Sequence, residues 1–110
     1  MLKVDGNNIF LTRGDSATLE LSVTQDEETY DFSGDDVVFS VKRFVTDKEA
    51  VIKKTFEDGK ISFAPEDTAD LPFGTYLYDV QLTHTSGEDV TVCTVIVPTT
   101  FIIGAEVTTD

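Results

Sequence analysis

The sequence predicts an all-β sandwich that forms one domain over residues 1–110. Short segments in which apolar and polar residues alternate recur along the chain, and turn-forming residues separate them. No stretch with helical periodicity is longer than a single turn. The chain has 110 residues, of which 40% are hydrophobic, so it fits one domain and can bury a core. We therefore expect about 7–9 antiparallel strands in two stacked sheets.

The first half of the chain contains two clear alternating segments. Residues 16–24 carry apolar side chains at every second position from Ala17, and residues 36–44 do the same from Val37. A period of two indicates a strand with one buried and one solvated face. Further strands in this half are expected at residues 8–12, 30–32 and 49–56.

The second half contains the longest alternating segment, residues 74–84, whose aromatic and aliphatic side chains from Tyr76 to Leu82 are expected to face the core. Residues 65–70 can form one helical turn, because Pro65 suits the first position of a helix. The remaining features are a hairpin turn at Ser86-Gly87-Glu88 and strands at residues 60–64, 89–97 and 101–108.

The stretch from Leu71 to Tyr78 predicts a tyrosine corner. In Greek-key sandwiches such a tyrosine opens a strand after a crossing loop, and its hydroxyl bonds to a backbone group a few residues upstream. Tyr76 would be that tyrosine, with Leu71 and Gly74 as its structural partners. Tyr78 stands where antibody-type domains carry a cysteine, so packing alone would hold such a sandwich. The alternative is an ordinary aromatic start to a strand.

The charge is strongly acidic, with 21 acidic and 8 basic residues and a net charge of −13. This balance argues against nucleic acid and anionic membranes as partners, because phosphate contacts need clustered Lys and Arg. The basic clusters are Lys42-Arg43 and Lys53-Lys54, and the second pair would protect an edge strand from pairing with another sheet. No apolar run is long enough to span a bilayer, and the N-terminus lacks the apolar stretch of a signal peptide.

No cofactor, metal or catalytic residue is predicted. The acidic loops offer oxygen ligands, yet none has the ligand spacing of an EF-hand, so a solvated surface is favoured over calcium. Those loops contain Asp26-Glu27-Glu28, Asp35-Asp36, Glu66-Asp67 with Asp70, and Glu88-Asp89.

Three smaller features have ordinary structural interpretations. Cys93, the single cysteine, is expected to be a small buried hydrophobe, and it excludes an intrachain disulfide. His84 has no nucleophile near it in sequence that would suggest a catalytic pair. Arg13-Gly14-Asp15 matches the tripeptide that integrins read, but Gly-Asp between two strands is also what a tight turn requires.

Five segments carry a recurring pattern of turns and hydrophobic residues along nearly the whole chain: Asn8–Ala17, Gly34–Val41, Lys60–Phe63, Gly74–Leu82 and Phe101–Thr108. In this order they resemble small immunoglobulin-like proteins encoded by tailed bacteriophages and prophages. These include the N-terminal domains of baseplate upper proteins and freestanding virion accessory domains.

The resemblance implies an immunoglobulin-like Greek-key fold and a non-enzymatic structural or accessory role in the tail, baseplate or capsid surface. The partners would be other virion proteins or further copies of the chain, and assembly would take place in the bacterial host cytoplasm. A small decoration or adaptor fits better than an adsorption arm, because no helical or receptor-binding region follows. The expected contact residues are Phe44, Val45, Val51 and Phe73.

The alternative is an adhesion module that binds a carbohydrate or another ligand with the loops at one end of the sandwich. Sugar sites usually stack an aromatic side chain on the sugar ring, and this chain has no Trp.

Overall fold

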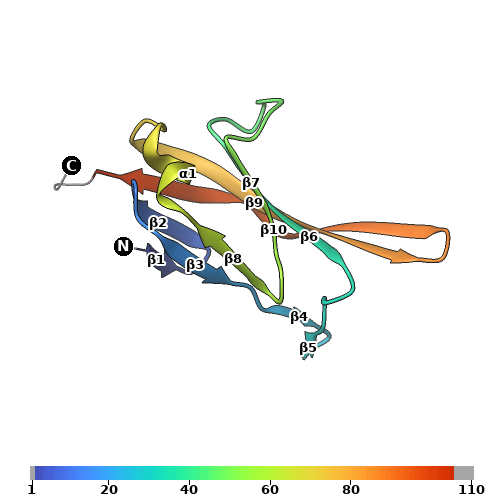
Figure 1. Cartoon of the computed structure of the whole chain (residues 1–110). Helices are drawn as coiled ribbons and strands as arrows, with labels where there is room; N and C mark the ends of the chain where they lie inside the picture. The colour runs from blue at the N-terminus through green and yellow to red at the C-terminus, as the bar shows by residue number, and fades with distance from the viewer. Residues whose placement is uncertain (1, 106–110) are drawn as a thin grey trace.

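The computed structural model describes residues 2–105, which form ten strands and one short helix (Figure 1). The all-β prediction is confirmed, and no helix in the described residues is long and apolar enough to cross a membrane. The elements are β1 (Leu2–Asp5), β2 (Asn8–Thr12), β3 (Ala17–Glu20), β4 (Val23–Gln25), β5 (Glu28–Tyr30), β6 (Asp36–Lys42), β7 (Ile52–Thr55), β8 (Lys60–Phe63), α1 (Pro65–Ala69), β9 (Gly74–Ser86) and β10 (Asp89–Gly104).

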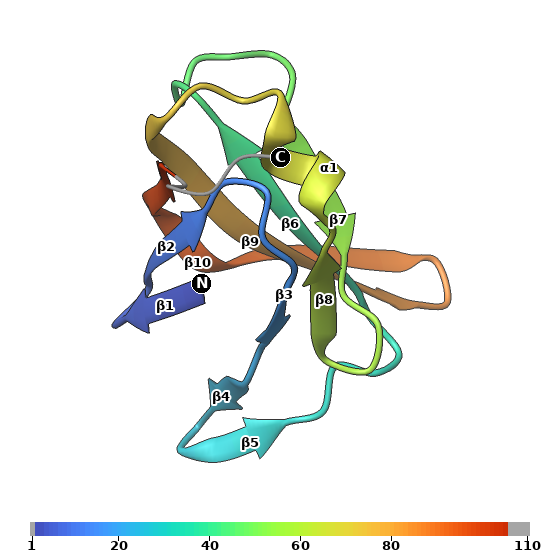
Figure 2. The ribbon, with the colours of Figure 1, turned by 60° about the vertical axis from the view of Figure 1, so that its left-hand side comes forward.

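The strands form two layers of unequal size. The larger sheet has six strands in the order β1-β2-β10-β9-β6-β7, and the pair β3-β8 faces it (Figure 2). The pair β4-β5 forms a separate hairpin at one end. The order β10-β9-β6-β7 is that of strands G, F, C and C′ in a variable-type immunoglobulin sandwich, and β3-β8 corresponds to the pair B-E. Among the described residues, the small sheet lacks the strands A and D that flank this pair in such sandwiches.

The prediction of 7–9 antiparallel strands is wrong in two respects. The described residues form ten strands, and β10 runs parallel to β2, with Phe101 opposite Ile9 and Gly104 opposite Thr12. These strands come from opposite ends of the chain, so no tight turn requires them to be antiparallel. The unexpected strand is β1, which has only four residues and is largely exposed, although Leu2 and Val4 alternate with Lys3 and Asp5.

The segment 16–24 is divided between two sheets. Its first part, β3, pairs with β8, and its last part, β4, pairs with β5. Its alternation continues across the break, because a period of two reports which way side chains face and not which strand lies alongside. The expected strand at 30–32 lies two residues earlier in the structure, as β5.

The expected break between residues 97 and 101 is absent, since β10 continues through Pro98. The pairing of β10 with β9 shifts register between Thr94 and Ile96 and again between Ile96 and Thr99. Such irregularities let a strand carry a proline, which cannot donate to the ladder. The last expected strand is described as far as Ala105, and its residues 106–108 lie outside the described residues.

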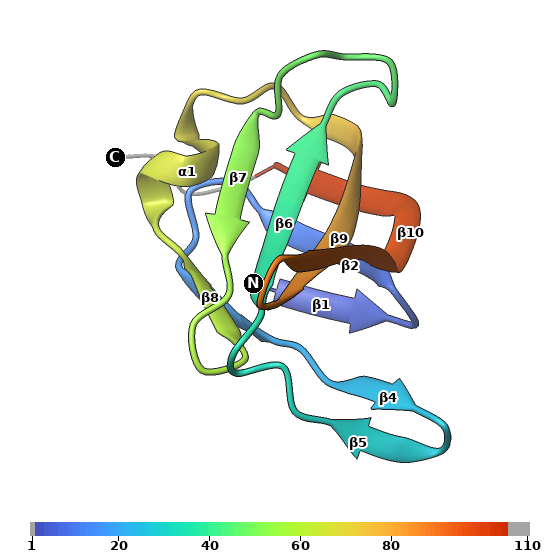
Figure 3. The ribbon, with the colours of Figure 1, turned by 90° about the vertical axis from the view of Figure 1, so that its right-hand side faces the viewer.

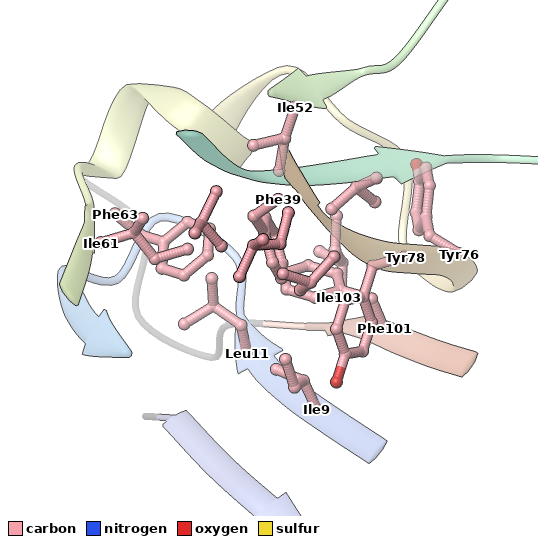
Figure 4. Close-up of a cluster of buried hydrophobic side chains, with 14 residues drawn as sticks. Ile9, Leu11, Phe39, Ile52, Ile61, Phe63, Tyr76, Tyr78, Phe101 and Ile103 are labelled. Carbon is pink, nitrogen blue, oxygen red and sulfur yellow. The ribbon is translucent and has the colours of Figure 1, made fainter. Parts of the chain in front are cut away.

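An aromatic cluster joins the two layers, with Phe39 of β6 at its centre (Figure 4). The Phe39 ring is 1% exposed, and its centroid lies 5.0–6.5 Å from four other aromatic rings. Edge-to-face contacts at these distances stabilise a core beyond the area that they bury. The four rings belong to Phe56, Phe63, Tyr78 and Phe101.

The helix α1 closes the flank of the sandwich beside β8. Asp67 accepts a hydrogen bond from the backbone N–H of Ala64 at 2.7 Å and forms an ion pair with Lys54 at 2.9 Å. The Lys54 ammonium also lies 5.8 Å from the centre of the Phe63 ring. Burial works to raise the pKa of Asp67, but the hydrogen bonds from Lys54 and Ala64 outweigh it, and the pKa falls below its ordinary value of 3.8.

We expect Phe39→Ala to lower the free energy of unfolding by about 3–5 kcal/mol, because it leaves a cavity where the two layers meet. Urea unfolding followed by circular dichroism would measure the loss. The control is Phe44→Ala, whose side chain is 62% exposed and whose effect should stay within about 0.5 kcal/mol. Equal effects of the two substitutions would contradict the central position of Phe39.

Candidate binding cleft

A cleft of about 830 Å³ opens between the two layers. Its floor is the inner face of the large sheet, where Ile9, Tyr78 and Val80 are buried and Ile96 is half-buried. Its wall is the chain from β3 into β4, which contributes Leu19 and other apolar side chains. The cleft is therefore an unfilled part of the sandwich interior, lined mainly by core-type side chains.

The cleft is open because the layers differ in length. The β9–β10 hairpin and the β4–β5 hairpin both extend at the same end of the molecule, and they diverge from each other (Figures 1 and 3). The small sheet ends before either tip, so nothing in the described residues covers the space between them. On the projecting part of β10, Val90 and Val92 are 60% and 61% exposed.

A hydrogen-bond network ties the two hairpins together at the cleft. The Tyr30 hydroxyl donates to one carboxylate oxygen of Asp35 at 2.6 Å, and Nδ1 of His84 lies 2.6 Å from the other. Tyr30 and His84 both line the cleft, and the Asp35 side chain is only 4% exposed. Sequence reasoning missed this network, because its members are far apart in the chain and belong to no spaced motif.

The network shifts the acidity of two of its members. The hydrogen bond from Tyr30, then the one from His84, lowers the pKa of Asp35 below its ordinary value of 3.8. The same bond to the Asp35 carboxylate raises the pKa of Tyr30 above 10.0, because ionisation would remove the donated proton. Both shifts favour the hydrogen-bonded form at neutral pH.

The expectation that Cys93 is buried is wrong, since its side chain is exposed. Cys93 lies opposite Leu82 on the part of the β9–β10 hairpin that projects past the small sheet, where no second layer covers it. It shares a face of the hairpin with His84, which lies opposite Thr91, and both line the cleft. Within residues 2–105, no hydrogen bond joins His84 to Cys93, so the two do not form a nucleophile–base pair in this structure.

The acidic loops are distributed over several parts of the surface. Asp26 and Glu27 form the tip of the β4–β5 hairpin, Glu66 and Asp67 lie in α1, and Glu88 and Asp89 lie at the tip of the β9–β10 hairpin. In the described part of the chain, no three His, Cys, Asp or Glu side chains are arranged to hold a metal ion.

The predicted tyrosine-corner residues lie together at the end of the sandwich away from the cleft. The Tyr76 hydroxyl donates to the carbonyl of Pro72 at 2.8 Å, four residues upstream. Leu71 packs against the core, and its N–H bonds to the Thr68 carbonyl at 3.0 Å. Gly74 has φ 139°, a backbone conformation that other residues rarely adopt, so this position favours glycine.

The tripeptide at Arg13 forms part of a turn, as the second interpretation predicted. The N–H of Asp15 bonds to the Thr12 carbonyl, and Gly14 has φ 82°. The N–H of Gly14 also donates at 2.8 Å to the hydroxyl of Thr68, a fully buried residue of α1. The Arg13 guanidinium lies 4.0 Å from the centre of the Phe73 ring. These contacts join the β2–β3 turn to the region around the tyrosine corner.

The four expected contact residues are exposed, between 41% and 62%. Three of them lie in or beside the β6–β7 loop, near Lys42 and Arg43, and the fourth lies under the Arg13 guanidinium. None of them lines the cleft, so they mark a surface distinct from it. They are Phe44, Val45, Val51 and Phe73.

Comparison with known proteins gives no relative: no family model, no curated protein and no solved structure matches the chain significantly. The cleft itself is therefore the basis for a functional argument.

We expect Asp35→Asn to destabilise the protein at neutral pH and the difference from the unsubstituted chain to vanish in acid. The folded pKa of Asp35 is lowered, so its stabilising effect is present above 3.8 and is lost as pH falls through the still lower folded value. Urea unfolding of both proteins between about pH 7 and pH 2 spans this titration. A difference that stays constant over the whole range would contradict the network.

We expect Tyr76→Phe to lower the free energy of unfolding by about 1–2 kcal/mol, because the Pro72 carbonyl loses its donor while the ring stays in place. Thermal and urea unfolding would measure the change. A variant as stable as the unsubstituted protein would show that the hydroxyl contributes nothing and that Tyr76 acts only through its ring.

Proposed function

We propose that this chain is a protein-assembly module, a structural or accessory domain of a tailed phage or prophage virion. The observation that carries the proposal is the apolar cleft of about 830 Å³ beside an unpaired sheet edge. Leu21, Val95 and Ile96 line this cleft and are only half-buried, and apolar surface of this kind often marks a site that another molecule covers.

The polar groups of the cleft support binding rather than catalysis. The Asp35 carboxylate is engaged on both oxygens, by Tyr30 and by His84, and its side chain is almost fully buried. A carboxylate held in this way braces the two hairpins against each other. Cys93, the nearest thiol, lies on an exposed strand with no base bonded to it among the described residues.

The resemblance to small immunoglobulin-like phage domains supports the virion setting. Those domains are structural parts that work through contacts with neighbouring proteins. The exposed aromatic and aliphatic side chains of the β6–β7 loop give a second apolar surface, outside the cleft. Two separate surfaces suit an adaptor or decoration protein, which touches more than one neighbour in a particle.

The size of the cleft favours a second candidate, an adhesion module that holds a carbohydrate or another small ligand. A volume of about 830 Å³ is typical of ligand sites. The core rings of Phe39 and Tyr78 line the cleft, but both are buried and belong to the aromatic cluster, so neither offers an open face to a sugar. A glycan array that shows one saturable sugar ligand, competing for the cleft, would favour this candidate over assembly.

We expect the chain to be present in particles of the phage or prophage that encodes it. Particles purified on a density gradient and analysed by quantitative mass spectrometry should contain it at a fixed ratio to a known structural protein. Presence in the lysate together with absence from purified particles would contradict a virion role. Treating the particles with high salt before the gradient separates a built-in component from an adsorbed one.

A further inference from the structure

The outer edge of β3 is an unpaired strand edge in the described residues. β3 pairs with β8 alone, and the N–H of Leu21 bonds to the Gly59 carbonyl at 2.8 Å just beyond the strand. Hydrogen-bonded pairs alternate along an antiparallel ladder, so the backbone N–H and C=O groups of Leu19 also point toward β8. The backbone groups of Thr18 and Glu20 therefore point away from β8. No other described strand pairs with them.

This edge is where an immunoglobulin sandwich places strand A beside strand B. Here the two N-terminal strands, β1 and β2, belong to the large sheet instead, next to β10. The place of strand A is thus left open, and the cleft occupies it: Leu19 and Glu20 of β3 line the cleft, and no residue of β8 does. On the β8 side of the small sheet, Lys54 forms an ion pair with Asp67 of α1 and lies 5.8 Å from the centre of the Phe63 ring.

The acidic side chains around the cleft indicate which kind of partner would bind there. Glu20 is the only acidic, lysine or arginine side chain among the described residues that line the cleft. The segments that adjoin the lining add Lys3 and Asp5 in β1, Asp26 and Glu27 in the β4–β5 turn, and Glu28 in β5, so acidic residues predominate. An apolar floor with an acidic rim fits a segment that carries both apolar and basic side chains.

We propose that the cleft binds an extended segment of another protein, which adds as a strand to the free edge of β3. The proposal rests on the assembly role proposed above. In this arrangement the backbone of the segment pairs with Thr18 and Glu20. Its apolar side chains, at every second position, lie against the half-buried Ile96, and its lysine or arginine side chains face the acidic rim.

The test uses two matched proline variants. Thr18→Pro removes the N–H that faces the open edge of β3 and leaves the β3–β8 bonds intact, since edge strands tolerate proline at such positions. Thr55→Pro is the control on β7, the edge of the large sheet. The N–H of Phe56 bonds to the Val37 carbonyl and Val38 lies opposite Thr55, so the N–H of Thr55 also faces away from its partner strand. Circular dichroism and urea unfolding would establish that both variants fold.

The probe is a synthetic peptide of about nine residues in which valine alternates with lysine and threonine. Isothermal titration and amide chemical shifts should show saturable binding to the unsubstituted protein and to Thr55→Pro, centred on β3. Thr18→Pro should bind at least about tenfold more weakly. A peptide with glutamate in place of lysine should also bind more weakly. Equal binding by Thr18→Pro, equal binding of the acidic peptide, or no saturable binding of either peptide would overturn the proposal.

Two further outcomes separate this proposal from its alternatives. If light scattering shows that the unsubstituted protein self-associates and that Thr18→Pro is monomeric, the occupant is a second copy, and the proposal of a basic partner fails. If the protein is built into purified particles but fails to bind the lysine peptide, strand addition fails while the virion role stands. If it binds the peptide but is absent from particles, the virion role fails alone.

Discussion

The aromatic cluster around Phe39 is the centre of the contact between the two layers of this sandwich. The Phe39 ring contacts Phe63 on the small sheet and Phe101 on β10, which lies two strands from β6 in the large sheet. A two-stranded sheet cannot cover six strands, so this cluster determines which part of the large sheet becomes interior. The rest of the inner face, toward the β9 and β10 tips, is left as the cleft.

The two ends of the sandwich are held by different means. At the closed end, Tyr76 bonds to Pro72, the N–H of Gly14 bonds to Thr68, and Arg13 lies over Phe73, so short polar contacts hold the crossing loops on the core. At the open end, polar links between the β4–β5 and β9–β10 hairpins run through the buried carboxylate of Asp35. The Tyr78 hydroxyl also donates to the Asn7 carbonyl at the cleft, so the open end is held by these polar contacts and leaves the cleft between them.

Much of the fold could be predicted from the sequence, because alternation reports side-chain direction directly. The buried side chains of Val37, Phe39 and Tyr76 follow from that pattern, and so does the hairpin at Gly87. The pairing of strands did not follow, since the parallel contact of β10 with β2 joins residues from the two ends of the chain.

The candidate site was harder to predict than the fold. The β4–β5 turn has Asp26 and Glu27 at φ 53° and 68°, a conformation usually signalled by Asn-Gly or Asp-Gly, so the hairpin that bounds the cleft had no sequence signature. Cys93 has the apolar neighbours of a core residue, yet it is exposed because the hairpin extends past the second layer. Exposure of this kind depends on the relative lengths of the two sheets, which local patterns do not report.

The central claim is that the edge of β3 is unpaired and available, and amide hydrogen exchange measured by NMR tests it most directly. We expect fast amide exchange at Thr18 and Glu20, whose N–H groups face the open edge. We expect slow exchange at Leu19 and Leu21, whose N–H groups bond to β8. On binding of the lysine peptide, Thr18 and Glu20 should become protected. Slow exchange at all four amides in the free protein would contradict the account, because it would show that the edge is already covered.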